Sequence, residues 1–416
     1  MLSDETIAIV KSTAPILEEH GETLTRHFYK RMFAHNPEVK VFFNPANQAA
    51  GLQQKALAGA ICAYAANIDN LAVLGGAVDL IAQKHASLLI KPEHYPIVGQ
   101  NLLASIREVL GAGATDEVIN AWASAYGFLA DILIGREKQI YHEHAATPGG
   151  WEGFKPFRVA RKEVESDVIT SFYLVPEDGV KLPAFKPGQY ITLRVPGQGG
   201  DTTMRNYSLS DKPGQEWFRI SVKREFGPAA DTPEGFVSNL LHNTVIAGNF
   251  LEVAPPCGEF FLDMTEKHVR PLVLLAAGVG ITPLLSILLS AIESTPSRQI
   301  ILIHGVLNER TQAFKRTIDA IAELRPNVKI HYRYSEGTNS SIAKQATVST
   351  GFIDAELIES LVPEQDGDYY FCGPQAFMVG IYHQLLAWGI PPSQTHFEFF
   401  GPRQDLEKPR QKSGSN

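Results

Sequence analysis

The sequence predicts an all-α domain, then an antiparallel β-barrel, then an α/β domain with a doubly wound parallel sheet. Three observations support this fold class. Residues 1–146 repeat apolar side chains at helical spacing, residues 156–263 contain short alternating runs separated by Pro and Gly, and residues 268–403 alternate strands with helices. The length of 416 residues also suits a chain of two or three domains.

The helical periodicity of the first domain is clearest after a helix start signal at Thr115-Asp116-Glu117. Apolar residues then recur three or four positions apart on one face, at Val118, Trp122, Tyr126, Leu129 and Leu133. Turn residues replace this pattern at 147–151. We therefore expect a linker over 147–155.

The second domain shows the alternation of half-buried strands, most clearly at 190–195 and 218–222. Short strands separated by Pro and Gly are typical of a barrel or a sandwich. In the third domain we expect strands and intervening helices in the order of a parallel sheet, with the strands at 272–277, 300–305, 328–334 and 369–372. The polar tail, 404–416, is expected to be flexible.

The amino-acid composition indicates a globular protein and excludes several function classes. Hydrophobic residues make up 44% and charged residues 20% of the chain, which argues against disorder, collagen and coiled coil. The net charge is −8 and no long run of Lys or Arg occurs, so nucleic acid is not an expected partner. Cys62, Cys257 and Cys372 form no CxxC, zinc or CxxCH pattern, and the N-terminus lacks a secretory signal. These features predict a cytoplasmic protein.

An uncharged run over 271–292 has about the length of a membrane span. Gly278, Gly280 and Pro283 interrupt its middle. This interruption favours a strand, a glycine turn and a helix over a transmembrane helix, so we expect no obligate membrane association.

Spacing identifies candidate ligand-binding residues in the helical domain. Gln53 and Leu57 lie one helical turn apart, so their side chains can face the same pocket. His85 follows about one helix-loop-helix unit later, which is enough chain to place it on the opposite wall. A lone His on a helix is usually an ordinary polar residue, so this spacing alone does not assign an iron ligand.

Two short motifs stand out in the second half of the chain. Residues 205–208 read R-N-Y-S and follow an expected strand, with P-G-Q-Y at 187–190 and G-F-V-S-N at 235–239. Residues 278–283 read G-V-G-I-T-P and follow an apolar strand, and C-G-P follows at 372–374. The glycines allow the backbone to approach a pyrophosphate, and we expect Thr282 to cap the next helix and Pro283 to occupy its first turn.

The helical segment resembles a globin, and its spacing of Tyr29, Phe43-Asn44-Pro45, Gln53, Leu57, His85 and Tyr95-Pro96 resembles the bacterial flavohaemoglobins. The resemblance implies one haem b, with His85 as the iron ligand and Phe43 stacked on the haem. Tyr29 and Gln53 would line the distal side, where Leu57 would narrow the access. Tyr95 and Glu137 would orient the His85 imidazole and make it more electron-donating. Lys84, beside that histidine, would raise the haem and flavin potentials.

The residue types alone leave simpler alternatives open for this set. Tyr29 can be an ordinary core tyrosine, and Lys84 can be a solvent-facing helix residue. Glu137 follows Arg136 and can belong to a surface ion pair of little energetic value.

The second half resembles the FAD barrel and the NAD(P)H domain of ferredoxin reductases. One FAD would be held by Arg205 on the diphosphate, Tyr207 on the isoalloxazine, Ser208 near its reactive nitrogen and the amides of Val237 and Ser238 on phosphate oxygens. The resemblance also assigns Tyr190 and Asn206 to FAD. Tyr190 can instead be a structural tyrosine in the barrel wall, and Asn206 is the variable position of the motif.

The resemblance assigns NAD(P)H to the turn at Gly278, Val279, Gly280, Ile281, Thr282 and Pro283 and to Cys372 and Gly373, which would border the nicotinamide. Cys372 can also be a buried thiol at a strand end. The closing segment would cover the flavin with Phe400, followed by Gly401, Pro402 and Arg403, with Glu398 as a neighbouring polar contact. Phe399 can instead belong to the core.

The resemblance implies NAD(P)H-dependent NO dioxygenation, in which electrons pass through FAD to haem and NO and O2 become nitrate. The alternatives are a haem and flavin reductase of hydroperoxides or other acceptors, and an O2 or NO sensor or carrier. The expected partners are O2, NO and NAD(P)H, and a monomer is expected. The sequence leaves open whether a lipid occupies the haem pocket, and whether Arg310, Lys315 and Arg316 select NADPH or only face solvent.

Overall fold

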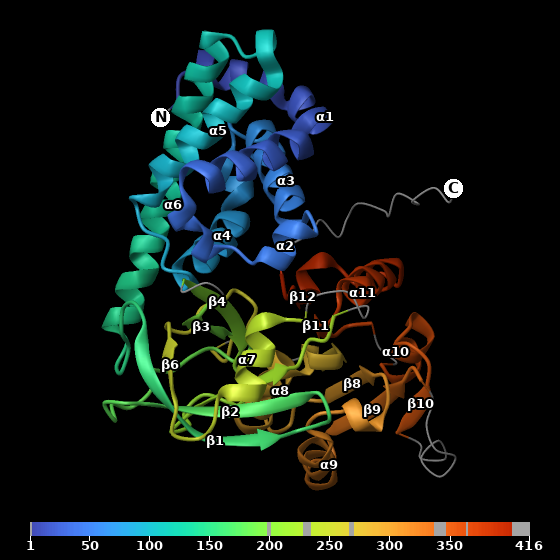
Figure 1. Ribbon diagram of the computed structural model, residues 1–416. Helices are drawn as coiled ribbons and strands as arrows, with labels where there is room; N and C mark the ends of the chain where they lie inside the picture. The colour runs from blue at the N-terminus through green and yellow to red at the C-terminus, as the bar shows by residue number, and fades with distance from the viewer. Residues whose placement is uncertain are drawn as a thin grey trace.

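The computed structural model describes residues 2–197, 201–227, 234–265, 270–336, 347–362 and 365–401. Helices of the first third of the chain form one body, and it rests on two sheet-containing bodies that lie side by side beneath it (Figure 1). The fold class is the predicted one: an all-α part, an antiparallel barrel and a parallel α/β part.

The helical part begins at α1 and ends with the long helix α6. Its elements are α1 (Asp4–His35), η1 (Pro37–Phe42), α2 (Pro45–Ala49), α3 (Leu52–Ala66), η2 (Leu71–Leu74), α4 (Gly75–Ser87), α5 (His94–Leu110), η3 (Gly111–Gly113) and α6 (Asp116–Ala146). Thr115 caps α6 as predicted, because its hydroxyl accepts the Val118 N–H at 3.3 Å. By length and composition α6 is the one described helix that could cross a membrane, and it packs against α1, α4 and α5.

The barrel consists of antiparallel strands and one helix. They are β1 (Lys155–Val164), β2 (Ile169–Pro176), β3 (Tyr190–Pro196), β4 (Thr202–Ser208), β5 (Phe218–Lys223), α7 (Phe236–Thr244) and β6 (Phe250–Val253). The sheet order is β4-β3-β6-β1-β2-β5, and a bridge between Leu209 and Ile220 joins its two ends. The closed sheet buries Phe157, Phe172 and Phe218 in its core.

The last part is a parallel sheet with helices on both faces. Its elements are β7 (Leu272–Ala277), η4 (Gly278–Gly280), α8 (Ile281–Ser294), β8 (Ile300–Val306), η5 (Glu309–Thr311), α9 (Lys315–Leu324), β9 (Val328–Tyr334), β10 (Val348–Thr350), α10 (Ala355–Leu361), β11 (Asp368–Cys372), α11 (Gln375–Ala387), η6 (Pro392–Gln394) and β12 (Thr395–Glu398). The order is β10-β9-β8-β7-β11-β12, with every pair parallel.

Each face of this sheet has its own apolar core. Helices α8 and α9 cover one face, and α10 and α11 cover the other. The uncharged run over 271–292 is therefore strand β7, a turn and helix α8, as predicted. The short elements β10, α10 and β12 are not predicted from the sequence.

Candidate functional site

The centre of the helical part is a hydrogen-bonded set of three side chains from three helices. His85 lies near the end of α4, Tyr95 at the start of α5 and Glu137 in α6. His85 Nδ1 is 2.7 Å from Glu137 Oε1, and the Tyr95 hydroxyl donates to the same oxygen at 2.5 Å. Glu137 is only 1% exposed, so the interpretation that it forms a surface ion pair with Arg136 is wrong. Arg136 instead pairs with Asp79 at 2.7 Å.

Two further tyrosines brace this set, and sequence reasoning missed both. The Tyr126 hydroxyl donates to the Tyr95 carbonyl at 2.6 Å, and the Tyr141 hydroxyl donates to the Ile90 carbonyl at 2.5 Å. The sequence pattern places Tyr126 only on the apolar face of the helix that follows Thr115. Burial and the neighbouring Glu137 carboxylate raise the pKa of Tyr95 far above its usual range, so the phenol stays a proton donor.

The His85 ring suits a haem ligand. Both of its hydrogen bonds use Nδ1, which leaves Nε2 available to bind iron. Among the described residues no group of three His, Cys, Asp or Glu side chains could hold a bare metal ion. A single imidazole with a carboxylate on its other nitrogen is a donor set that fits haem iron.

Aromatic side chains surround Tyr29 in the core of the helical part. Tyr29 of α1 packs against Phe43 with ring centroids 5.5 Å apart and against Phe33 at 5.8 Å. Tyr29 is 8% exposed, and burial raises its pKa well above the usual range. Leu57 of α3 packs against the same core. Among the described residues the Tyr29 hydroxyl has no hydrogen-bond partner, so it can donate to a ligand.

Gln53 belongs to a cluster of three glutamines. Gln48 Nε2 donates to Gln53 Oε1 at 2.6 Å, and Gln54 Nε2 donates to Gln48 Oε1 at 2.8 Å. Gln54 is 6% exposed and its Oε1 has no hydrogen-bond partner among the described residues. Sequence reasoning found Gln53 alone, because the adjacent Gln54 lies on a different face of α3.

Lys84 lies between the helical part and the barrel and does not face solvent. Its Nζ is 5.1 Å from the centre of the Tyr190 ring in β3. Burial lowers the pKa of Lys84, and the Glu398 carboxylate acts in the opposite direction. The segment 395–398, which was singled out only for its resemblance, therefore brings a carboxylate close to the residue beside His85.

The R-N-Y-S segment forms β4 at the edge of the barrel that faces the helices. Arg205 donates to the Met204 carbonyl at 2.7 Å and to Asn44 Oδ1 at 3.1 Å. Burial lowers its pKa, and no carboxylate of a described residue pairs with it. A half-buried guanidinium without an acidic partner fits an anionic phosphate group. Tyr207 and Ser208 follow it on the strand, and Ser208 is buried.

The first turn of α7 also fits a phosphate. Its N-cap is Gly235, which offers no side chain to the first-turn amides, and Val237 and Ser238 lie in that turn. At the other end of α7, Lys162 Nζ donates to the carbonyls of Leu241, His242 and Val245 at 3.2, 2.7 and 3.0 Å. Sequence reasoning missed this lysine, because β1 lies far from α7 in the chain.

The G-V-G turn joins β7 to α8. Gly278 has φ +55°, and a Cβ on Gly280 would lie 2.0 Å from the Cys372 carbonyl oxygen, so glycine is needed at both positions. The expectation that Thr282 caps α8 is wrong: α8 begins at Ile281 with Gly280 as its N-cap, and the Thr282 hydroxyl donates to the Val279 carbonyl at 3.0 Å. The first-turn amides of α8 are thus free of a side-chain cap, which suits a pyrophosphate.

The remaining expected residues occupy several environments. Cys372 is fully buried at the end of β11, next to Gly280, and Gly373 follows it. Phe399 is 9% exposed and belongs to the core, whereas Phe400 is 50% exposed and Gly401 follows it. Pro402 and Arg403 lie outside the described residues. Arg310 pairs with Asp167 at 2.6 Å, and Lys315 pairs with Asp319 at 2.5 Å, so existing ion pairs engage both cations.

Family profiles match each part of the chain. The profile described as Globin matches residues 26–133, the oxidoreductase FAD-binding domain matches 156–262 and the oxidoreductase NAD-binding domain matches 274–383. Fold, site and profiles together define a globin joined to FAD- and NAD-binding oxidoreductase domains in one chain.

Similar proteins narrow this class further. A flavohemoprotein of Rhodopirellula baltica is 48% identical over 406 residues, which are 98% of this chain and 99% of that protein. The chain belongs to the flavohemoprotein family.

Two solved structures are also similar. The flavohemoglobin of Malassezia yamatoensis was solved with bound FAD and haem. The match covers 96% of this chain and 100% of that chain, with a TM-score of 0.81 and 24% sequence identity. This similarity supports the fold. The FAD/NAD-binding domain of nitric oxide dioxygenase from Vibrio cholerae is 35% identical, with a TM-score of 0.52. The match covers 60% of this chain and 99% of that domain.

Proposed function

We propose that this chain is an NAD(P)H-dependent nitric oxide dioxygenase that converts NO and O2 to nitrate. The observation that carries the proposal is the hydrogen-bonded set of His85, Tyr95 and Glu137 in the same helical domain as a buried Tyr29, whose hydroxyl has no hydrogen-bond partner among the described residues. The barrel contacts helix α4, which bears His85, and the nucleotide-binding part contacts the barrel through a hydrogen bond from Ser286 to the Asp211 carbonyl.

Each of the three implied cofactors supplies one part of the electron transfer. When bound, NAD(P)H supplies a hydride, FAD converts that electron pair into single electrons, and haem b accepts single electrons at a metal that binds gases. His85 would hold the haem; Arg205, Tyr207 and the first turn of α7 would hold FAD; and the turn at 278–283 with Cys372 and Gly373 would hold NAD(P)H.

On the proximal side, the protein controls the His85 imidazole. Glu137 accepts the Nδ1 proton in a charge-assisted hydrogen bond, and Tyr95 holds the carboxylate by donating to the same oxygen. A partly withdrawn proton makes the imidazole a stronger electron donor. This arrangement supports activation of O2 over simple storage.

On the distal side, the Tyr29 hydroxyl is a fixed proton donor. Its raised pKa keeps it protonated throughout the physiological range, and its apolar surroundings strengthen any hydrogen bond that it makes. It can stabilise negative charge that develops on a reacting oxygen. Phe43 and Leu57 pack against the same apolar cluster as Tyr29.

An oxygen-dependence experiment tests the proposed function against its two rivals. NO consumption by the full-length holo-protein with NADH is followed with an NO electrode in the presence and absence of O2. We expect consumption only with O2, with one nitrate formed per NO. A reductase of other acceptors would consume NO slowly in both conditions, and a sensor or carrier would stop after a single equivalent.

We further propose that the protein acts as a cytoplasmic monomer on O2, NO and NAD(P)H. The helical part, the barrel and the nucleotide-binding part contact one another within a single chain, so no second copy is needed to bring them together. Occupancy of the haem pocket by a lipid is tested by extraction and mass spectrometry of the purified protein.

A further inference from the structure

The helical part and the barrel meet along one side of α4. Ala82 and Ala86 are 0% and 2% exposed, and they form an apolar cluster with Tyr190 of β3, Cys257 and Ile140. Small side chains allow the helix backbone to approach the barrel closely. The same helix bears His85, so the position of α4 on the barrel also sets the position of the imidazole.

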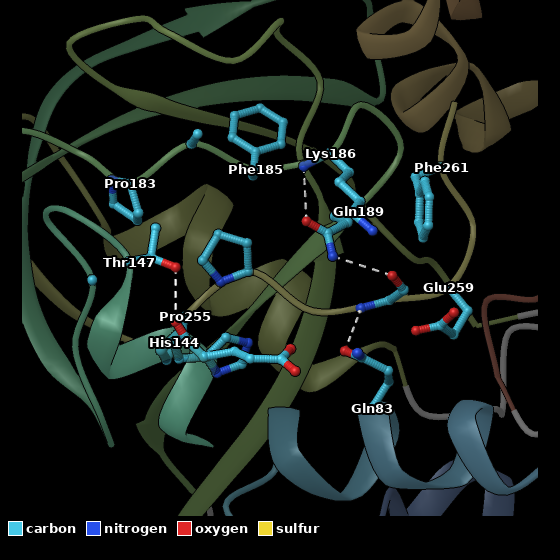
Figure 2. A pocket seen from close by; sticks show the side chains of 15 residues that line it. Gln83, His144, Thr147, Pro183, Phe185, Lys186, Gln189, Pro255, Glu259 and Phe261 are labelled. Atoms are coloured by element: carbon cyan, nitrogen blue, oxygen red, sulfur yellow. Dashed lines mark hydrogen bonds between the residues drawn. The ribbon is translucent and has the colours of Figure 1, made fainter. Parts of the chain in front are cut away.

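One hydrogen-bond chain crosses this interface through Gln83. The Gly258 N–H donates to Gln83 Oε1 at 3.2 Å, and Gln189 Nε2 donates to the Gly258 carbonyl at 3.2 Å. Gln189 Oε1 in turn accepts the Lys186 N–H at 2.9 Å. Figure 2 shows Gln83 reaching up from its helix to this loop. Gln83 is 9% exposed, so the contact is shielded from water.

A second contact crosses the interface one helical turn further along α4. Ser87 is 1% exposed and donates to the Lys84 carbonyl at 2.8 Å, which leaves its oxygen lone pairs free to accept. Asn206 Nδ2 donates to that oxygen at 3.4 Å. Ser87 therefore connects α4 to β4, the strand that carries Arg205 and Tyr207.

The loop that receives Gln83 has a fixed conformation. Gly258 has φ +121°, and a Cβ there would lie 2.9 Å from the Tyr190 ring. Cys257 and Tyr190 exchange both backbone hydrogen bonds, at 2.9 and 2.8 Å. Gln83 thus binds to a segment that is itself held against Tyr190.

We propose that Gln83 and Ser87 are positioning residues that hold α4 on Tyr190 and thereby set the rate at which electrons pass from the flavin to the haem. This inference depends on the proposed function, in which one NADH gives NAD⁺, a proton and two electrons. Those electrons leave the reduced flavin singly and convert two ferric irons to ferrous irons. Neither residue contacts a reacting atom; both act by fixing the separation of the two redox groups.

The packing between α4 and the barrel is incomplete beside Gln83, so the hydrogen bonds of Gln83 and Ser87 contribute to holding the two parts together. A cavity of ≈ 180 Å³ lies beside Gln83, between α4, the end of α6 and the barrel loops (Figure 2). The contacts of Gln83 and Ser87 across the interface are neutral hydrogen bonds, and each such hydrogen bond changes an equilibrium by about fivefold. Interfaces between domains of one chain permit relative motion unless they are large and apolar. Loss of both contacts therefore favours separation of α4 from the barrel.

The test compares Gln83→Met, Ser87→Ala and the double variant with a matched control, Gln139→Met with Ser124→Ala. Gln139 and Ser124 are exposed on α6 and bond only to neighbours on that helix. Stopped-flow absorbance of the holo-protein with NADH under CO follows the reduction of FAD and of haem separately. We expect haem reduction to slow by about fivefold or more in the double variant. Reduction of FAD and of added ferricyanide should stay within about twofold of wild type.

Hydrogen exchange of the Gly258 amide provides a second readout that needs no turnover. This amide should be protected in the wild-type holo-protein and should exchange faster in Gln83→Met but not in the control. Unchanged haem reduction in the double variant, or equal slowing of FAD and haem reduction, would overturn the inference. A wild-type protein whose haem is not reduced by NADH would instead refute the proposed function.

Discussion

His85 Nδ1 lies 2.7 Å from Glu137 Oε1, although the two residues are on different helices and Glu137 is almost completely buried. A carboxyl group buried at such a site needs hydrogen-bond donors, and the imidazole N–H and the Tyr95 hydroxyl provide them. The imidazole is therefore oriented and polarised by the fold before any ligand binds.

Replacing Glu137 by Gln should weaken this polarisation while preserving the shape of the site. Because an amide oxygen accepts less strongly than a carboxylate, we expect the iron–histidine stretching frequency to fall and NO turnover to drop about 10- to 100-fold. Resonance Raman spectroscopy of the ferrous protein and an NO electrode measure the two effects. Tyr95→Phe, which keeps the carboxylate, should have the smaller effect. An unchanged stretching frequency in Glu137→Gln would contradict this role.

Tyr29→Phe should remove the distal hydrogen-bond donor without changing the packing against Phe43. We expect O2 to dissociate about 10- to 100-fold faster, as for a lost hydrogen bond to a charged group, and NO turnover to fall. Dye reduction through FAD should survive. Tyr64→Phe is the matched control, because the Tyr64 hydroxyl donates to the Ala125 carbonyl in the same core. Equal loss of NO turnover and dye reduction in Tyr29→Phe would count against a distal role.

Lys162→Met should weaken FAD binding without touching the flavin. Lys162 is bonded to three carbonyls at the C-terminal end of α7, and the opposite end of this helix carries the amides of Val237 and Ser238. Loss of a cation at a helix C-terminus costs up to about 1 kcal/mol, so the FAD dissociation constant should rise about two- to fivefold. Fluorescence titration of the apoprotein measures it. Lys223→Met, which removes only an exposed pair with Glu225, should leave it unchanged.

His304 should make the nucleotide-binding part sensitive to acid. His304 is fully buried beneath the G-V-G turn with Nε2 3.1 Å from the Gly278 carbonyl oxygen, and burial lowers its pKa from 6.5 to about 4. The unfolded chain therefore binds more protons than the folded one below pH 6.5. The free energy of unfolding falls as the pH drops from 6.5 to about 4, by up to about 3 kcal/mol.

Thermal unfolding at pH 7 and pH 5 checks this contribution. His304→Gln retains a donor for the Gly278 carbonyl but cannot titrate. Its unfolding temperature should therefore depend less on pH than that of the wild type. An equal pH dependence in both proteins would show that His304 does not contribute.

The sequence predicts the fold class well because its signals are local. Thr115 precedes an apolar helical face, and alternating side chains at 190–195 form a barrel strand. The expected strand at 272–277 also forms as β7. The short elements β10 and α10 escape prediction, since a strand of three residues shows too little periodicity to be recognised.

The candidate site is predicted less completely, because its contacts join residues that are far apart in the chain. Spacing alone could not pair Arg205 with Asn44 or Gln83 with Gly258, because each of these contacts joins the helical part to the barrel. The error at Thr282 is local: its hydroxyl donates to the Val279 carbonyl, because the helix begins at Ile281, two residues earlier than a Thr282 cap would require.

The most direct test of the account is to add NADH to the anaerobic, ferric holo-protein and record the absorption spectrum over time. The account predicts that the flavin bands bleach and that the haem bands then change to those of the ferrous state without any second protein. Bleaching of the flavin with iron that stays ferric would contradict the claim that one chain carries electrons from nicotinamide to haem.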